Sequence, residues 1–168
     1  DCDNDGWQYL FVANCHVLDN IELFDQSTTY PQRPLLFHNE GFNQHGKIAF
    51  AEVGLHSGAG MQATLVGRGT AAGDYDNDGD LDLLVINLGR PLALLRNEGR
   101  PGHHWLSLRT VGSASNRDGI GARVKVVAGD LVQVQEVRSS RSYLSSSDLR
   151  LHFGLGTHPR IDQLEIRW

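Results

Sequence analysis

The sequence lacks most of the patterns that would assign it to a common functional class. No run approaches the roughly 18 apolar residues of a membrane span, so no spanning helix is expected. The two cysteines, Cys2 and Cys15, are too few for a disulfide framework, and they form no CxxC or Cys/His ligand pattern, which argues against zinc. The sequence leaves open whether these two thiols form one bridge or stay free.

Catalytic and nucleic-acid-binding patterns are also missing. There is no Gly-x-Ser-x-Gly, no HExxH and no Walker loop, and Gly67 and Gly69 lack the strand-turn-helix setting of a dinucleotide site. No basic cluster lies on a helical pattern, so nucleic acid is not an expected partner. We therefore expect that this chain is not an enzyme.

What is present is acidity concentrated at two places. The chain has 168 residues, 40% of them hydrophobic, enough for one domain or for one large and one small module. Its net charge of −5 divides into −8 over residues 1–102 (6 basic, 14 acidic) and +3 over residues 103–168 (9 basic, 6 acidic). Eight of the 14 aspartates lie in residues 1–5 and 74–82, a concentration typical of a cation site rather than of a diffusely acidic surface.

An internal repeat contains both acidic stretches. Each copy has an acidic loop, a short apolar run, a second strand pattern and an Asn-Glu-Gly turn. The first copy comprises residues 1–6, 10–14 and 35–41, and the second comprises residues 74–79, 83–87 and 94–99. Residues 15–33 form an extra loop in the first copy. A unit of about four strands is typical of a propeller blade, which buries its faces against neighbouring blades.

The remaining segments also indicate strands. They are short, rich in β-branched or aromatic residues and bounded by Gly, Pro and Asn, and no segment has a sustained helical period. The composition changes at residues 100–102, so we expect repeat blades over residues 1–102 and a small antiparallel β module over residues 103–168. Because the only methionine is Met61 and the chain ends within a strand pattern, we also expect a piece of a longer protein.

The module has the clearest strand pattern of the chain. We expect strands at residues 103–111, 122–128, 131–138, 149–154 and 162–168. In the last of these, Leu164, Ile166 and Trp168 alternate with polar residues, which predicts one buried and one solvent-facing side. Gly129-Asp130 has the composition of a tight turn between two of the strands.

The acidic loop of residues 74–82 is the strongest candidate site. Counting from Asp74, carboxylates stand at positions 1, 3, 5 and 9, glycine allows a sharp turn at position 6, and a carbonyl is available at position 7. So many hard oxygen donors suit Ca²⁺ better than Mg²⁺. The loop differs from an EF-hand, because position 12 is Val85 and strands flank it. A plain Asn-Asp-Gly turn is the alternative interpretation. The candidate ligands are Asp74, Asp76, Asp78, Asp80 and Asp82.

The loop of residues 1–9 repeats this pattern less completely. Asp1, Asp3 and Asp5 stand at positions 1, 3 and 5, and Trp7 offers a carbonyl. Position 9 is Tyr9, so the fourth carboxylate is missing and weaker calcium binding is expected. A degenerate turn without metal is the alternative.

These motifs carry a resemblance to known families. Residues 74–87 resemble an FG-GAP/VCBS repeat, the blade unit of integrin-α-like propellers, while residues 115–123, 143–145 and 148–156 resemble the ASPIC/UnbV module. This order is similar to the cartilage acidic protein and UnbV-like family. The resemblance implies a secreted protein, extracellular or periplasmic, with the terminal blades of a calcium-binding propeller and a C-terminal β module. Matched by position, the resemblance implies these calcium ligands: Asp74, Asp76, Asp78, Asp80 and Asp82 in the second loop, and Asp1, Asp3 and Asp5 in the first.

We therefore expect an extracellular scaffold, stabilised by calcium, that recognises a protein or a glycan. The alternative is a calcium-dependent glycan hydrolase or lyase whose catalytic residues lie in missing blades. Three interpretations are open for several basic residues of the module. They form a face that binds an anionic glycan, they occupy outward strand positions, or they dock onto the acidic loops. They are Arg109, Arg123, Lys125, Arg138, Arg141, Arg150 and Arg167.

Overall fold

All 168 residues are described by a computed structural model, in which strands account for 39% of residues and helix for 6%. The expected all-β fold is confirmed. The helical residues form three 3-10 turns: η1 (Ile21–Leu23), η2 (Gly54–His56) and η3 (Ala59–Gln62). No helix has the length and apolar character needed to cross a membrane. The strands are β1 (Leu10–Val12), β2 (Leu35–Phe42), β3 (Ile48–Glu52), β4 (Gly67–Gly73), β5 (Asp82–Asn87), β6 (Ala93–Leu95), β7 (His104–Leu108), β8 (Arg123–Ala128), β9 (Leu131–Glu136), β10 (Leu151–Gly156) and β11 (Gln163–Arg167).

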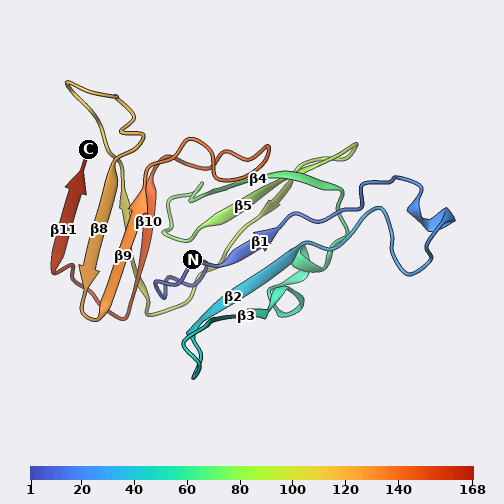
Figure 1. Cartoon of the computed structure of the whole chain (residues 1–168), viewed down its shortest axis with the longest axis horizontal. Helices are drawn as coiled ribbons and strands as arrows, with labels where there is room; N and C mark the ends of the chain where they lie inside the picture. The colour runs from blue at the N-terminus through green and yellow to red at the C-terminus, as the bar shows by residue number, and fades with distance from the viewer.

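The repeat region forms two separate three-stranded antiparallel sheets. One has the order β1-β2-β3 and the other β4-β5-β6, and they lie side by side in the middle of the molecule (Figure 1). The equivalent strands of the two copies are β1 with β5 and β2 with β6. Residues 88–92 join the second pair, whereas residues 13–34 join the first, and the extra loop projects far from the sheets (Figure 1). Neither sheet closes on itself, so the propeller blades remain a prediction.

Residues 103–168 form a small β-sandwich. One sheet has the order β11-β8-β9, and the other consists of β10 and β7 (Figure 1). Its core contains eight buried apolar residues, and fully buried apolar side chains contribute about 1.5–3 kcal/mol each. These residues are Ala122, Val124, Val126, Ala128, Val137, Leu151, Phe153 and Leu155. The turn at Gly129-Asp130 joins β8 to β9, with Gly129 at a φ of +58° that favours glycine.

The prediction for the last strand was correct in orientation and wrong in burial. In the register of β11 with β8, Leu164 lies opposite Val126 and Ile166 opposite Val124, so both face the core. They are nevertheless 47% and 39% exposed, and Trp168 is 63% exposed. The reason is that β11 is the edge of its sheet and the opposing sheet has only two strands. Alternation therefore predicted the face but not how much of it is covered.

A segment of the module covers the free edge of β4. The amide N–H groups of Thr70 and Ala72 donate to the Oγ atoms of Ser145 and Ser147, at 3.0 and 3.1 Å. The N–H of Asp148 in turn donates to the Ala72 carbonyl at 3.0 Å. We call residues 144–148 the strap. Its approach requires glycine in β4, because a Cβ at position 69 would overlap the Leu144 carbonyl oxygen.

Replacing Gly69 with alanine is therefore expected to displace the strap and to lower the free energy of unfolding by about 1–3 kcal/mol. Faster hydrogen exchange at the Thr70 and Ala72 amides would report the displacement. Gly46→Ala is the control, because that glycine has no neighbour within 4 Å and only its positive φ penalises a side chain. Unchanged exchange at both amides in Gly69→Ala would contradict the assignment.

Candidate metal centre

The loop after β4 folds its aspartates inward around its own backbone. Both carboxylate oxygens of the buried Asp74 accept backbone N–H groups, from Asp78 and Gly79, each at 3.1 Å. Asn77 and Gly79 have positive φ values of 60° and 95°, and these values produce the tight turn. Asp82, only 2% exposed, accepts N–H groups from Tyr75 at 3.2 Å and from Asn97 at 2.8 Å.

This fold brings three of the five candidate ligands together. Asp74, Asp76 and Asp82 each offer a carboxylate oxygen, and these three oxygens lie within 4.8 Å of one another. Asp78 is outside this group; it is exposed, and its Oδ1 accepts the N–H of Asp80 at 3.0 Å. Asp80 differs, because its Oδ1 accepts a hydrogen bond from the side chain of Asn4 at 2.9 Å. The side chain of Asp80 is therefore committed to the neighbouring loop, which leaves its carbonyl for the predicted role at position 7.

One cation of the protein itself balances part of this charge. The guanidinium of Arg96 lies 3.2 Å from Asp76 and 3.6 Å from Asp78, and it is half exposed. Burial, followed by the charge of Asp78, raises the pKa of Asp80. Burial also raises the pKa of Asp82, against the lowering effect of its two backbone N–H donors. Arg96 therefore leaves an excess of negative charge at the loop.

The first acidic loop reproduces the same backbone scheme. Asp1 accepts N–H groups from Asp5 at 3.2 Å and from Gly6 at 2.9 Å, as Asp74 does in the second loop. Asn4 and Gly6 have φ values of 59° and 93°, matching those of Asn77 and Gly79. The internal repeat found in the sequence thus extends to the dihedral angles and hydrogen bonds of both loops.

The ligand groups of the first loop differ from those of the second. Here Asp3 and Asp5 lie within 4.8 Å of His38, while Asp1 is outside the group. The Oδ1 atom of Asp3 is buried without a hydrogen-bond partner, although its Oδ2 pairs with Arg100 at 3.1 Å. Burial and the charges of Asp3 and Asp5 raise the pKa of Tyr9, which occupies position 9. The Trp7 carbonyl accepts no hydrogen bond, and its role as a ligand stays a prediction.

Sequence reasoning missed His38 and Arg96. Each residue immediately precedes the asparagine of an Asn-Glu-Gly turn, and each lies against the carboxylates of its own loop. Aligning the two copies by these turns would have identified both positions.

The two cysteines are free in the structure, and the Sγ of Cys15 accepts a hydrogen bond from Arg68 at 3.0 Å.

Asn4 connects the two loops with each other and with the module. Its Nδ2 donates to the Gly79 carbonyl at 3.1 Å and to Asp80, and its own carbonyl accepts the N–H of Gly156 at 2.7 Å. Its Oδ1 lies 2.7 Å from Nε2 of His152. Because the Asn4 amide donates twice, its oxygen is the acceptor, so Nε2 of His152 carries the proton. Strand β10 therefore closes over the first loop.

The family comparison identifies the segment to which this strand belongs. Residues 112–168 match the family model described as ASPIC and UnbV. The match includes β8 to β11, and the sandwich is completed by β7, which pairs with β10. No curated protein matches the chain. The ASPIC/UnbV part of the resemblance found in the sequence is thereby confirmed.

The ASPIC/UnbV segment contacts the second loop through Arg150. Its guanidinium donates to the Asp74 carbonyl and to Oδ1 of Asn77, both at 2.7 Å, and to the Asp148 carboxylate at 2.6 Å. Of the interpretations considered for the basic residues, docking onto the acidic loops is correct for Arg150. Nothing in the sequence distinguishes Arg150 from the other arginines, because its role depends on the contact between the module and the loop.

The second loop fits a calcium ion better than the first. Ligand oxygens lie about 2.3–2.6 Å from Ca²⁺, so ligands of one ion are separated by at most about 5 Å, and the oxygens of Asp74, Asp76 and Asp82 meet that limit. In the first loop, the unpartnered Asp3 oxygen is an acceptor that a cation would satisfy. The imidazole of His38, however, departs from the all-oxygen set that Ca²⁺ prefers.

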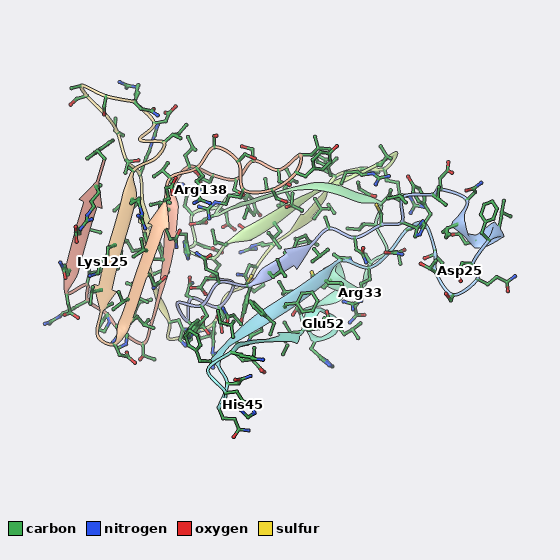
Figure 2. The ribbon with its side chains drawn as sticks, in the orientation of Figure 1. Asp25, Arg33, His45, Glu52, Lys125 and Arg138 are labelled. Carbon is green, nitrogen blue, oxygen red and sulfur yellow. The ribbon has the colours of Figure 1, made fainter.

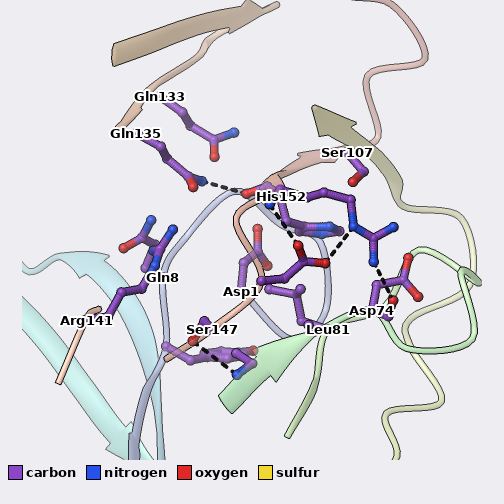
Figure 3. A pocket seen from close by; sticks show the side chains of 15 residues that line it. Asp1, Gln8, Asp74, Leu81, Ser107, Gln133, Gln135, Arg141, Ser147 and His152 are labelled. Carbon is purple, nitrogen blue, oxygen red and sulfur yellow. Dashed lines mark hydrogen bonds and ion pairs between the residues drawn. The ribbon is translucent and has the colours of Figure 1, made fainter. Parts of the chain in front are cut away.

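A polar pocket of about 190 Å³ lies where the ASPIC/UnbV segment meets the loops (Figure 3). Asp1 and Asp74 line it from the loops, and Gln135, Arg141 and His152 line it from the module. Burial lowers the pKa of His152 to about 4, so this histidine is neutral at neutral pH. The pocket thus places amide, guanidinium and carboxylate groups around one small space.

Proposed function

We propose that this chain is the calcium-stabilised part of an extracellular recognition scaffold, in which repeat blades of the FG-GAP/VCBS type carry an ASPIC/UnbV module. The observation that carries the proposal is the second acidic loop, where three carboxylate oxygens gather within 4.8 Å. Calcium at Asp74, Asp76, Asp78 and Asp82, with the Asp80 carbonyl, would neutralise charge that Arg96 balances only in part. The role of the ion is structural.

The arrangement of the sheets supports the propeller-blade part of the proposal. In the second copy, β4 precedes the loop and pairs with β5, and in the first copy β3 follows β2 and pairs with it. When the equivalent pairs β1-β2 and β5-β6 are aligned, β4 lies on one side of the pair and β3 on the other. The two copies together therefore define one unit of four antiparallel strands. Four strands per repeat is the number found in a propeller blade.

The position of the charged groups supports a recognition role rather than catalysis. The carboxylates of both loops are held by backbone N–H groups or lie against arginine, asparagine or histidine of the protein. Millimolar calcium outside the cell would keep sites of modest affinity filled, which agrees with the proposed secreted or periplasmic location. Surfaces of the module would then recognise a protein or a glycan.

Calcium is expected to raise the midpoint of thermal unfolding by about 5–10 °C, because a ligand at 100 times its Kd stabilises the folded state by about 2.7 kcal/mol. Differential scanning calorimetry in calcium, in magnesium and in chelator would measure this shift. Magnesium at the same concentration should produce a smaller shift. A midpoint that is the same in calcium and in chelator would contradict a structural calcium site, and turnover of a glycan substrate would contradict a purely scaffolding role.

A further inference from the structure

The outer face of the β11-β8-β9 sheet carries a row of basic side chains. Its other face packs on the sandwich core through Val124 and Val126, so Arg123 and Lys125 of the same central strand point outward. The strand register extends the row onto β11, because Arg167 lies directly opposite Arg123. Figure 2 shows Lys125 near the middle of this sheet and Arg138 near the end of β9.

Two shallow hollows adjoin on this face, and the second extends toward the interface with the loops. The first, of about 200 Å³, is lined by Arg123, Lys125, Val134, Glu165 and Arg167. The second, of about 400 Å³, shares Arg123 and Val134 with it and adds Gln8, Gln135, Glu136, Arg138 and Arg141. Three of these residues, Gln8, Gln135 and Arg141, also line the polar pocket in Figure 3. We call these two adjoining hollows the basic trough.

The basic trough has unbalanced positive charge. Its five basic side chains face two carboxylates, and two of the arginines are neutralised locally, Arg167 by Glu165 at 2.7 Å and Arg138 by Glu136 at 3.1 Å. The other three, Arg123, Lys125 and Arg141, have no carboxylate within 4.0 Å.

The strand register places charges of both signs along this face. Arg123 lies opposite Arg167 on one neighbouring strand and opposite Glu136 on the other, and Lys125 lies opposite Glu165. Like charges directly opposite each other destabilise a sheet, whereas opposite charges stabilise it. A bound anion would relieve the repulsion between Arg123 and Arg167, and the three cations without a carboxylate within 4.0 Å remain available to it.

We propose that the basic trough binds a linear anionic polysaccharide, with its sulfate or carboxylate groups on Arg123, Lys125 and Arg141. The proposal rests on the recognition function above and names its surface and its ligand class. Two adjoining hollows fit a chain molecule, and the amide of Gln8 suits sugar hydroxyl groups, whereas the amide of Gln135 donates to the His152 carbonyl at 2.6 Å. No aromatic ring lines either hollow, so the base-stacking platform expected of a single-strand nucleic-acid site is missing.

The test uses a size-defined heparin decasaccharide as the probe, with binding to the whole chain measured by titration calorimetry in calcium at an ionic strength of about 0.1 M. We expect binding that weakens as salt rises. The triple variant Arg123→Gln, Lys125→Gln, Arg141→Gln should weaken it by about tenfold or more. The triple variant Lys47→Gln, Arg90→Gln, Arg117→Gln removes the same charge at exposed positions outside the trough and should change affinity by less than about twofold.

Three results would overturn the proposal. The first is that heparin does not bind. The second is that both triple variants weaken heparin binding equally. The third is that single-stranded DNA binds as tightly as heparin and that the first triple variant abolishes this DNA binding. The thermal response to calcium, measured on the same samples without heparin, separates this proposal from the preceding one. A chain that calcium stabilises but that binds no heparin would retain the scaffold function and lose the polysaccharide site.

Discussion

Replacing Asp74 with alanine is expected to lower the free energy of unfolding by about 3–5 kcal/mol in calcium and to abolish the stabilisation by the ion. Asp74 is 5% exposed, and its two oxygens accept the N–H groups of Asp78 and Gly79. Each hydrogen bond to a charged group contributes about 1.5–3 kcal/mol, and its loss leaves a buried donor unsatisfied. Urea unfolding in calcium and in chelator would measure both effects.

Two further variants separate the roles of this carboxylate. Asp74→Asn keeps the size and one acceptor oxygen, so it should lose the calcium response while retaining more stability in chelator than Asp74→Ala. Asp19→Ala removes an exposed carboxylate outside both loops and should leave stability within about 0.5 kcal/mol of the parent chain. If Asp74→Ala still responded to calcium as the parent does, the ion would bind elsewhere.

The second large effect concerns pH and His152. Burial lowers the pKa of this histidine to about 4 in the folded state, against an ordinary value near 6.5 in the unfolded chain. The unfolded chain therefore binds the proton first, so stability is fully present above about pH 6.5 and falls as pH decreases toward 4. The loss is about 3 kcal/mol over that interval. Protonation would place a second N–H on Nδ1, which is buried without a partner.

Denaturant unfolding at several pH values between 7 and 4, with calcium present, would measure this dependence. His152→Gln removes the titrating group and keeps a side-chain amide that can reach Asn4. Its stability should change less over the same interval than that of the parent chain. The raised pKa values of Asp80 and Asp82 stabilise the folded state as pH decreases, opposite to the effect of His152. Because the parent chain and the variant share these two aspartates, the difference between their stability curves reports His152 alone. Parallel curves for the two proteins would show that burial does not depress the pKa of this histidine.

The strands were predictable because their signals are local. Alternation and turn residues predicted every strand of the module, and Gly129-Asp130 marked the hairpin between β8 and β9. The extent of burial at Leu164 and Ile166 was not predictable, because it depends on how many strands lie opposite them. The purpose of Gly69 was equally hidden, since the strap that approaches it lies 75 residues further along the chain.

The acidic loops were predictable as turns but only partly as ligand sets. The spacing of Asp74, Asp76 and Asp82 identified three residues that do come together. It offered the carbonyl of Asp80 at position 7, but it did not indicate that the Asp80 side chain is bound by Asn4 from the other loop. That contact joins residues 76 positions apart, so no local spacing contains it. His38 and Arg96 were within reach of sequence reasoning, because the repeat itself aligns them.

The strap has a consequence for aggregation. An open strand edge is a template on which a second molecule can add its own backbone, and hydroxyl side chains of the strap occupy the amides of β4 without extending the sheet. The edge is thus blocked by a segment whose neighbour, Tyr143, is 81% exposed and open to proteases. A cut there falls between Val137 and Leu151 of the sandwich core and would loosen the strap, so we expect a nicked population to pair between molecules through the exposed edge of β4.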